Sequence, residues 1–375
     1  MVLLLSACGS REQATLGHFT RALYTPTYAT GFSILGPSDT TQIREGESVL
    51  IRIPAPWQGE RAEEQQLFIV RGEAAIPQGY RGPVLRDAAR RIVCMSSSHV
   101  AMLDRLGAVE RVVGVSGIDF IANPSIREHR DRIADVGYDG NIDYERLIAQ
   151  RPDLVLLYGI TGASAMEHRL RELGIPYLYI GEYMEEDPLG KSEWLVVIAE
   201  LLGCRERGEE LFREIPERYK KLKALAAEAR TPRPKVMINT PYADSWFMAS
   251  ATSYVARLIG DAGGEYLYRR NTANHSLPID IEEAARLTAE ADIWLNVGEV
   301  QSLQELRERF PKFADVACVQ RGEVYNFDKR RHAGGGNDYW ESGVMNPDLV
   351  LRDLIAIFHP ELLPEHEFEY YRKLK

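Results

Sequence analysis

The sequence contains few cysteines and no long apolar run. Its four cysteines, at positions 8, 94, 204 and 318, stand in separate segments without the CxxC or Cys/His spacing that holds zinc. We expect Cys94, Cys204 and Cys318 to be buried thiols, not members of a zinc site or a disulfide framework. The only export-like apolar stretch is residues 1–5, far shorter than the ~20 residues needed to cross a bilayer. The mature chain is therefore predicted to have no membrane-spanning helix.

The sequence also contains fewer basic than acidic residues. The chain carries 45 Lys and Arg against 55 Asp and Glu, which gives a net charge of −10. An acidic surface repels nucleic acids and anionic membranes at long range, so neither is expected as a general partner. An anionic ligand would have to meet a local basic patch.

Catalytic and metal-binding motifs are missing as well. Neither His-Glu-x-x-His nor Gly-x-Ser-x-Gly occurs, and the 8 histidines are scattered. Residues 190–192, Gly-Lys-Ser, imitate the end of a phosphate-binding loop, but Glu185 stands where the upstream glycine belongs. We predict no catalytic residue, no metal site and no resident cofactor. With 375 residues, 45% of them apolar, the chain is long enough for two or three folding units.

The N-terminus resembles the lipobox of bacterial lipoproteins. In residues 5–9, Leu-Ser-Ala-Cys-Gly, small residues precede Cys8, whose thiol would be diacylated before cleavage. No Lys or Arg precedes the apolar run, so the basic region of a signal peptide is missing. A chance match at the terminus is the alternative. We predict a protein on the periplasmic side of a bacterial membrane, attached through the lipid on Cys8 alone.

The pattern of apolar and polar residues changes near Arg91. Residues 9–90 carry short β-like runs such as 48–53 and 66–70, separated by turns that contain Gly and Pro. Beyond Arg91, apolar runs alternate with helix-like stretches, which indicates βαβ units around parallel sheets. The sequence therefore predicts a β-rich extension followed by an α/β fold.

Two short patterns recur in the same order. Residues 98–103 (Ser-His-Val-Ala-Met-Leu) return as 253–258 (Ser-Tyr-Val-Ala-Arg-Leu), each after an apolar strand candidate. Residues 142–145 (Ile-Asp-Tyr-Glu) return as 279–282 (Ile-Asp-Ile-Glu), each before a strand. The order predicts two α/β lobes of one ancestral plan, although a chance match of common strand–helix chemistry remains open.

A long helical connector is predicted between the lobes. Residues 193–230 are helix-like, with apolar positions three and four residues apart from Leu211 to Leu225. Pro216 is expected to kink this helix or to begin a new one. A stiff connector favours limited hinge closure over wide opening. The predicted segments are a signal remnant 1–8, an extension 9–90, a first lobe 91–187, a connector 188–230, a second lobe 231–365 and a tail 366–375.

At this point the chain resembles the ferric-siderophore and cobalamin periplasmic-binding family. The residues that carry the resemblance, from about Arg91 to Pro360, are Arg91-Ile92-Val93 followed by Ser96-Ser97-Ser98, Leu106-Gly107-Ala108 followed by Val112-Val113-Gly114-Val115, Asp143 to Ala149 with Arg151 to Val155, Leu173-Gly174-Ile175-Pro176, Ala199 to Gly203, and Ala262-Gly263-Gly264. The resemblance implies two Rossmann-like lobes, a ligand in the cleft between them, and docking onto an ABC permease with its ATPase. It implies a binding protein and not an enzyme.

The expected ligand is an iron complex of the ferric-siderophore type. Cobalamin or heme is the alternative ligand. A third hypothesis for the function is an α/β enzyme that acts on a tetrapyrrole. The residues predicted to face the ligand lie at strand ends and in loops, where open α/β proteins bind: Ser98, His99, Tyr242, Trp246, Phe247, His275, Arg330, Arg331 and Trp340. Arginines suit carboxylate or catecholate oxygens, and aromatic rings suit a ring system. Ser98 could instead be only a helix cap, and 329–332 only a solvated basic turn.

Permease docking is expected at acidic groups on the lobe tips. In cobalamin-binding relatives one glutamate on each lobe meets arginines of the permease, but Ser164 and Thr252 stand at the matching positions here. Glu167 lies three residues after Ser164 on a predicted helix, so it could present a carboxylate to nearly the same surface. The second lobe would dock through hydroxyls or through Asp244.

Overall fold

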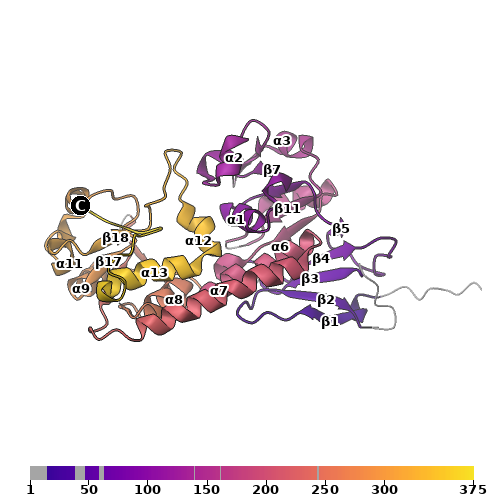
Figure 1. Ribbon diagram of the computed structural model, residues 1–375. Coiled ribbons are helices and arrows are strands. Elements are labelled where there is room, and N and C mark those ends of the chain that lie inside the picture. The colour runs from indigo at the N-terminus through magenta and orange to yellow at the C-terminus, as the bar shows by residue number, and fades with distance from the viewer. Residues whose placement is uncertain (1–14, 39–46, 59–62, 139, 161, 243–244) are drawn as a thin grey trace, which may run out of the picture.

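The computed structural model describes residues 15–38, 47–58, 63–138, 140–160, 162–242 and 245–375. Two α/β lobes lie side by side, joined along one side by the long helix α7 (Arg205–Ala226). A separate β-sheet packs against the N-terminal lobe and the adjoining end of that helix (Figure 1). The predicted fold class, two Rossmann-like lobes with a β-rich extension, is confirmed. None of the described helices is long and apolar enough to span a membrane.

The N-terminal extension forms its own sheet. Strands β1 (Phe19–Tyr24), β2 (Ser33–Pro37), β3 (Val49–Ile53), β4 (Gln65–Val70) and β5 (Val84–Arg86) are hydrogen-bonded in sequence order, antiparallel except for the parallel β4–β5 pair. Alternating side chains bury both faces. Ile34, Ile51 and Leu67 join the main core, while Phe19, Leu50 and Phe68 form a smaller cluster.

The N-terminal lobe is built on a parallel sheet in the order β12-β11-β6-β7-β8. Its strands are β6 (Ile92–Cys94), β7 (Val112–Val115), β8 (Ala134–Asp135), β11 (Leu154–Leu157) and β12 (Tyr177–Tyr179), with a small β9 (Gly137–Tyr138)–β10 (Asn141–Ile142) hairpin. The helices are α1 (Ser97–Arg105), α2 (Pro124–Glu128), α3 (Tyr144–Ala149) and α4 (Ala165–Glu172), with 3₁₀ turns η3 (Val109–Arg111), η4 (Ile118–Phe120) and η5 (Glu182–Met184). Continuous apolar runs such as β11 are buried on both faces, as parallel strands require.

The C-terminal lobe repeats this plan. Its sheet runs β15-β13-β17-β18-β19, from β13 (Lys235–Ile238), β15 (Glu265–Tyr266), β17 (Ile293–Leu295), β18 (Val324–Asn326) and β19 (Arg372–Lys373), beside a β14 (Trp246–Met248)–β16 (Leu277–Ile279) pair. The helices are α8 (Tyr254–Asp261), α9 (Ile281–Ala289), α10 (Leu303–Arg309), α11 (Ala317–Gln320), α12 (Ser342–Met345) and α13 (Pro347–Phe358), with η6 (Pro311–Phe313), η7 (Asp338–Trp340) and η8 (Pro360–Leu362). Since β19 pairs antiparallel with β18, residues 366–375 belong to this lobe and are not a separate tail.

The internal repeat holds at the level of topology. In each lobe the first strand, β6 or β13, lies between the second strand, β7 or β15, and a later strand, β11 or β17. The next strand along the chain, β12 or β18, lies beyond that later strand. The second repeated pattern also falls at matching places, because Asp143 caps α3 ahead of β11 and Asp280 caps α9 ahead of β17. The first pattern is offset: α1 is capped by Ser96, whereas α8 is capped by Ser253.

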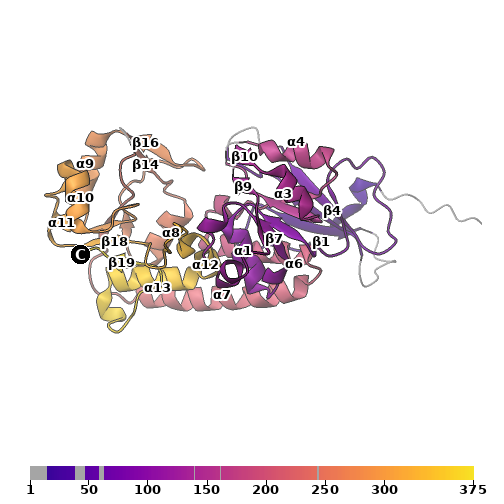
Figure 2. The same cartoon turned by 90° about the horizontal axis from the view of Figure 1, so that it is seen from above.

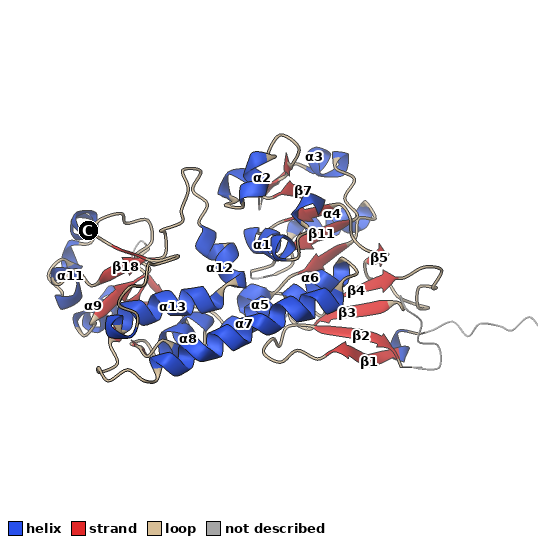
Figure 3. Ribbon diagram, in the orientation of Figure 1, coloured by secondary structure: helices blue, strands red, loops and turns tan. Residues whose placement is uncertain are grey.

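The connector consists of α5 (Pro188–Glu193), α6 (Leu195–Leu201) and α7. Figure 3 shows that α7 runs alongside α6 on the side of the N-terminal lobe and alongside α13 on the side of the C-terminal lobe. Pro216 lies buried inside α7, so the expectation that it begins a helix is wrong. The extension contacts this connector through Glu193. The buried carboxylate of Glu193 accepts hydrogen bonds of 2.7 Å from the backbone N–H groups of Thr27, Tyr28 and Ala29. The extension is thus hydrogen-bonded to the connector between the two lobes.

Candidate functional site

A cavity of about 300 Å³ lies between the two lobes. Ser97 and Phe120 line it from the N-terminal lobe, and the C-terminal lobe supplies Gly298, Glu299, Phe327, Asp328, Arg331, Gly335, Gly336, Asn337 and Trp340. These residues follow β6, β7, β17 and β18, at the carboxyl ends of the two parallel sheets. Open α/β proteins bind ligands at this edge. The cavity is therefore the candidate ligand site.

Exposed aromatic side chains line the cavity from both lobes. Phe120, at the end of η4, is 58% exposed, and Trp340, at the end of η7, is 46% exposed. Trp340 is held edge-on by Phe327, with ring centroids 5.3 Å apart, and by Tyr339 at 4.9 Å. Two flat apolar surfaces that belong to different lobes suit a ligand with its own flat or apolar surface. Phe120 was not predicted, although its place after the β7 strand was a usable signal.

Charge in the cavity is largely paired. Arg331 forms an ion pair with Glu299, and both residues line the cavity. Asp328 is buried and holds the Arg372 guanidinium at 2.7 and 2.9 Å. The predicted ligand residue Arg330 does not line the cavity, because it pairs with Asp338 at 2.8 Å and with Glu369. Of the two predicted arginines, the structure brings only Arg331 to the site.

A glycine-rich tip of the C-terminal lobe touches the N-terminal lobe. A Cβ on Gly336 would lie 2.3 Å from the carbonyl oxygen of Phe120, and one on Gly334 would lie 2.5 Å from that of Asp119. An isolated bridge between Arg331 and Asn337 closes the base of this tip. Only glycine permits so close an approach of two backbones. The tip lines one side of the cavity and brings the backbones of the two lobes into contact.

Ser98 and His99, predicted to face the ligand, are buried in α1 and do not line the cavity. The Ser98 hydroxyl donates to Glu182 at 2.5 Å, and burial lowers the pKa of His99 to about 3. The residue that reaches the cavity is Ser97. Successive helical residues point about 100° apart, so one position separates a cleft side chain from a core side chain.

The predicted aromatic cluster after β13 is divided in the structure. Trp246 is fully buried, stacks on Trp294 with centroids 5.6 Å apart, and donates its indole N–H to the Ile238 carbonyl. It is a core residue. Tyr242 and Phe247 are exposed on the C-terminal lobe but outside the cavity lining, and so is His275, whose Nδ1 lies 3.1 Å from the Asn274 side chain.

The predicted docking residue Glu167 is turned inward. It is only 8% exposed, and its carboxylate accepts from the Tyr177 hydroxyl at 3.0 Å, the Tyr179 hydroxyl at 3.1 Å and the Arg171 guanidinium at 2.5 Å. With these partners it offers no free charge to a permease arginine. Thr252 donates to Glu186, whereas Asp244 and the proposed lipidation site Cys8 lie outside the described residues.

Comparison with known proteins agrees with this two-lobed architecture. Residues 92–330 match the family model described as periplasmic binding protein. The chain belongs to the periplasmic binding protein family. Two uncharacterised lipoproteins of Methanocaldococcus jannaschii are similar to it: one is 25% identical over 303 residues (77% of this chain, 70% of the relative), the other 22% over 322 residues (83% and 80%).

Solved structures share the fold of this periplasmic binding protein. A periplasmic heme binding protein from Pseudomonas aeruginosa superimposes with a TM-score of 0.59 at 18% identity, covering 76% of this chain and 98% of the other. An ABC-type Fe3+-hydroxamate transport system protein from Saccharomonospora viridis gives a TM-score of 0.55 at 16% identity, covering 72% and 94%. At these identities the likeness is one of fold. In the parts of this chain that the structure describes, no group of three or more His, Cys, Asp or Glu side chains could hold a metal ion.

Proposed function

We propose that this protein is the substrate-binding lipoprotein of an ABC importer, which captures an iron complex between its lobes and delivers it to a membrane permease. The observation that carries the proposal is the cavity lined from both lobes, with Phe120 and Trp340 at its walls. A ligand there touches both lobes at once, so its binding favours the arrangement that a permease would recognise. Neither a histidine nor a cysteine is among the described residues that line the cavity, which fits a carrier better than an enzyme.

The ligand class follows from the lining. A carrier of bare metal ions would need several convergent imidazoles or carboxylates that are free to bind. The two carboxylates of this cavity, Glu299 and Asp328, are paired with Arg331 and Arg372, and the lining also contains aromatic rings. A ferric hydroxamate or another organic iron chelate fits that lining. Heme is the second candidate, because a flat macrocycle would stack on such rings and because similarly folded proteins are described as heme-binding.

Titration of the purified protein with a ferric hydroxamate, hemin and cobalamin tests this proposal. One ligand should bind at 1:1 stoichiometry and be recovered unchanged. Phe120→Ala and Trp340→Ala should each weaken it about tenfold, the effect of losing one aromatic contact of about 1.4 kcal/mol. Tyr138→Ala, which removes an aromatic residue that is 60% exposed outside the cavity, is the matched control. Turnover of a ligand would favour the enzyme reading, and failure of all three to bind would reject the proposed ligand class.

The lipid anchor is a separate part of the proposal. It rests on residues 5–9 and on the description of two relatives as lipoproteins. Full-length protein expressed in a bacterial host should enter the detergent phase of a cloud-point extraction, and Cys8→Ser should remain in the aqueous phase. If full-length protein and Cys8→Ser partition equally, the proposed lipid anchor is wrong, but the proposal for the cleft is not affected.

A further inference from the structure

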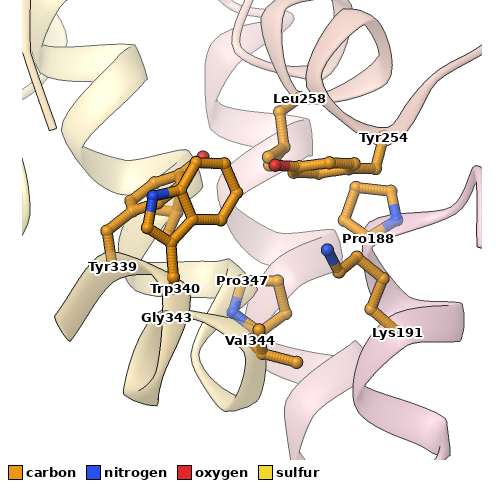
Figure 4. Close-up of a pocket in the computed structure, with 10 residues that line it drawn as sticks. Pro188, Lys191, Tyr254, Leu258, Tyr339, Trp340, Gly343, Val344 and Pro347 are labelled. Atoms are coloured by element: carbon orange, nitrogen blue, oxygen red, sulfur yellow. The ribbon is translucent and has the colours of Figure 1, made fainter. Parts of the chain in front are cut away.

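A second, smaller cavity lies directly behind Trp340. It measures about 20 Å³ and is lined by Pro188, Lys191, Tyr254, Leu258, Tyr339, Trp340, Gly343, Val344, Pro347 and Val350. Trp340 also lines the large inter-lobe cavity, so its indole stands between the two spaces. Figure 4 shows the Lys191 side chain reaching from α5 toward the space bounded by the Tyr254 ring and Trp340.

Lys191 is buried without a matching carboxylate. It is 7% exposed, and its Nζ lies over the Tyr254 ring, 3.9 Å from the centroid. Across the described residues, none of the ion pairs and hydrogen bonds found engages this ammonium. Glu182 and Glu185 raise its pKa from a distance, but burial dominates and lowers the pKa to about 8. A buried cation without direct partners is unfavourable, so an anion placed beside it would be bound strongly.

The two acids nearest to Lys191, Glu182 and Glu185, both accept hydrogen bonds from other groups. Glu185 accepts from the amides of Thr30 and Gly31 and from the Trp194 indole, which fixes it away from the cavity. Glu182 accepts from Ser98 through Oε1, its buried Oε2 has no hydrogen-bond partner among the described residues, and burial raises the pKa of this carboxyl. Neither lines the small cavity, whose other walls are mainly Pro, Leu, Val and aromatic side chains. Among the described residues that line the space in front of Lys191, none is a carboxylate that could pair with its ammonium.

We propose that Lys191 is the cation of an anion subsite behind Trp340, which receives a carboxylate arm of the ligand held in the inter-lobe cavity. This inference rests on the proposed function and narrows it to iron complexes that carry a free carboxylate. The carboxylate enters when the partly exposed Trp340 indole turns aside, and its charge is then matched by the buried ammonium. Because the subsite is formed by α5 of the connector and by α8, η7, α12 and α13 of the C-terminal lobe, an occupied subsite also fixes the hinge.

Acetate and its neutral isostere acetamide test the subsite independently of the iron cargo. Buried lysine ammonium groups can be followed by NMR, and Lys191→Met assigns the signal of this one. Acetate should shift that signal in a saturable way and acetamide should not. Lys220, an exposed lysine over the Tyr28 ring at 5.7 Å, should not respond and serves as the internal control. An unmoved Lys191 signal at high acetate would overturn the subsite whatever the cleft binds.

Hemin and its dimethyl ester test the link to the cargo, since they differ only in their two carboxylates. The parent protein should bind hemin more tightly, and Lys191→Met should lower hemin affinity about tenfold, as expected for a lost hydrogen bond to a charged group, while leaving the ester unchanged. Lys220→Met should change neither affinity. Equal binding of both by the parent protein would overturn the carboxylate role. If neither binds while acetate still shifts Lys191, the subsite stands and a tetrapyrrole cargo is excluded.

Discussion

Glu341 of the C-terminal lobe accepts a hydrogen bond from the backbone N–H of Ala122 of the N-terminal lobe at 2.7 Å. Its side chain is buried between the lobes, one residue after Trp340. Burial, together with Asp338 and Asp104, raises the pKa of this carboxyl to about 8. A contact that joins the lobes thus carries a group that titrates close to neutral pH, and it lies next to a wall of the candidate ligand site.

Replacing Glu341 by Gln should flatten the pH dependence of stability. A carboxyl whose folded pKa is raised from 4.5 to about 8 contributes stability that is fully present below 4.5 and is lost as the pH rises through 8. Thermal unfolding from pH 5 to 9 should show the parent protein losing more stability than Glu341→Gln across this window. Glu110→Gln, at an exposed glutamate, is the control. Parallel profiles for parent and Glu341→Gln would contradict the assignment.

A methyl group on Gly336 should force the lobes apart. Its Cβ would lie 2.3 Å from the carbonyl oxygen of Phe120, so Gly336→Ala requires the tip or the lobe to move. Small-angle scattering should give a larger radius of gyration, and affinity for the cleft ligand should fall. Gly260→Ala is the matched substitution, because an added Cβ there meets nothing within 4 Å. Unchanged scattering and affinity for Gly336→Ala would show that the tip does not hold the lobes together.

The two adjacent arginines should behave differently. Arg331 lines the cavity, whereas Arg330 is held by Asp338 and Glu369 outside it. Arg331→Ala should weaken an anionic iron chelate by about 1.5–3 kcal/mol, because it removes a charged donor and leaves Glu299 unpaired. Arg330→Ala should leave affinity unchanged and reduce stability by about 1–3 kcal/mol, because the nearly buried Asp338 carboxylate loses its cation. Titration and urea unfolding of both variants separate these roles, and equal losses of affinity would refute the distinction.

Glu167 should contribute to stability and not to transport. Its carboxylate accepts from two tyrosine hydroxyls and one guanidinium in a buried position. Glu167→Gln should lower the free energy of unfolding by about 1–2 kcal/mol while uptake per folded molecule matches the parent. Glu172→Gln, on the exposed side of the same helix, should leave the unfolding midpoint in place. A loss of uptake with normal stability would restore the docking role.

The lobes could be predicted from sequence because their signals are local and repeated. Apolar strands followed by capped helices recur in both halves, and Asp143 and Asp280 mark the same step of each. Pro216 misled the prediction of the connector, because packing of α7 against α6 and α13 holds the helix through a residue that would break an isolated one.

The site was harder to predict, because it depends on the direction of single side chains. Ser97 and Ser98 are neighbours in one helix turn, yet only Ser97 lines the cavity. Trp246 lies in a segment rich in exposed residues, but as part of β14 it faces the core and stacks on Trp294. The Lys191 subsite is assembled from the connector and four elements of the C-terminal lobe. No local pattern encodes a contact between segments so far apart.

The most direct test of the central claim is native mass spectrometry of the protein purified from its own host under non-denaturing conditions. The account predicts one additional mass per chain with the isotope pattern of an iron complex. That mass should be greatly reduced in a Phe120→Ala, Trp340→Ala double variant and retained in Tyr138→Ala. A bound species without iron, or an iron complex retained in full by the double variant, would contradict the claim that the inter-lobe cavity carries an iron chelate.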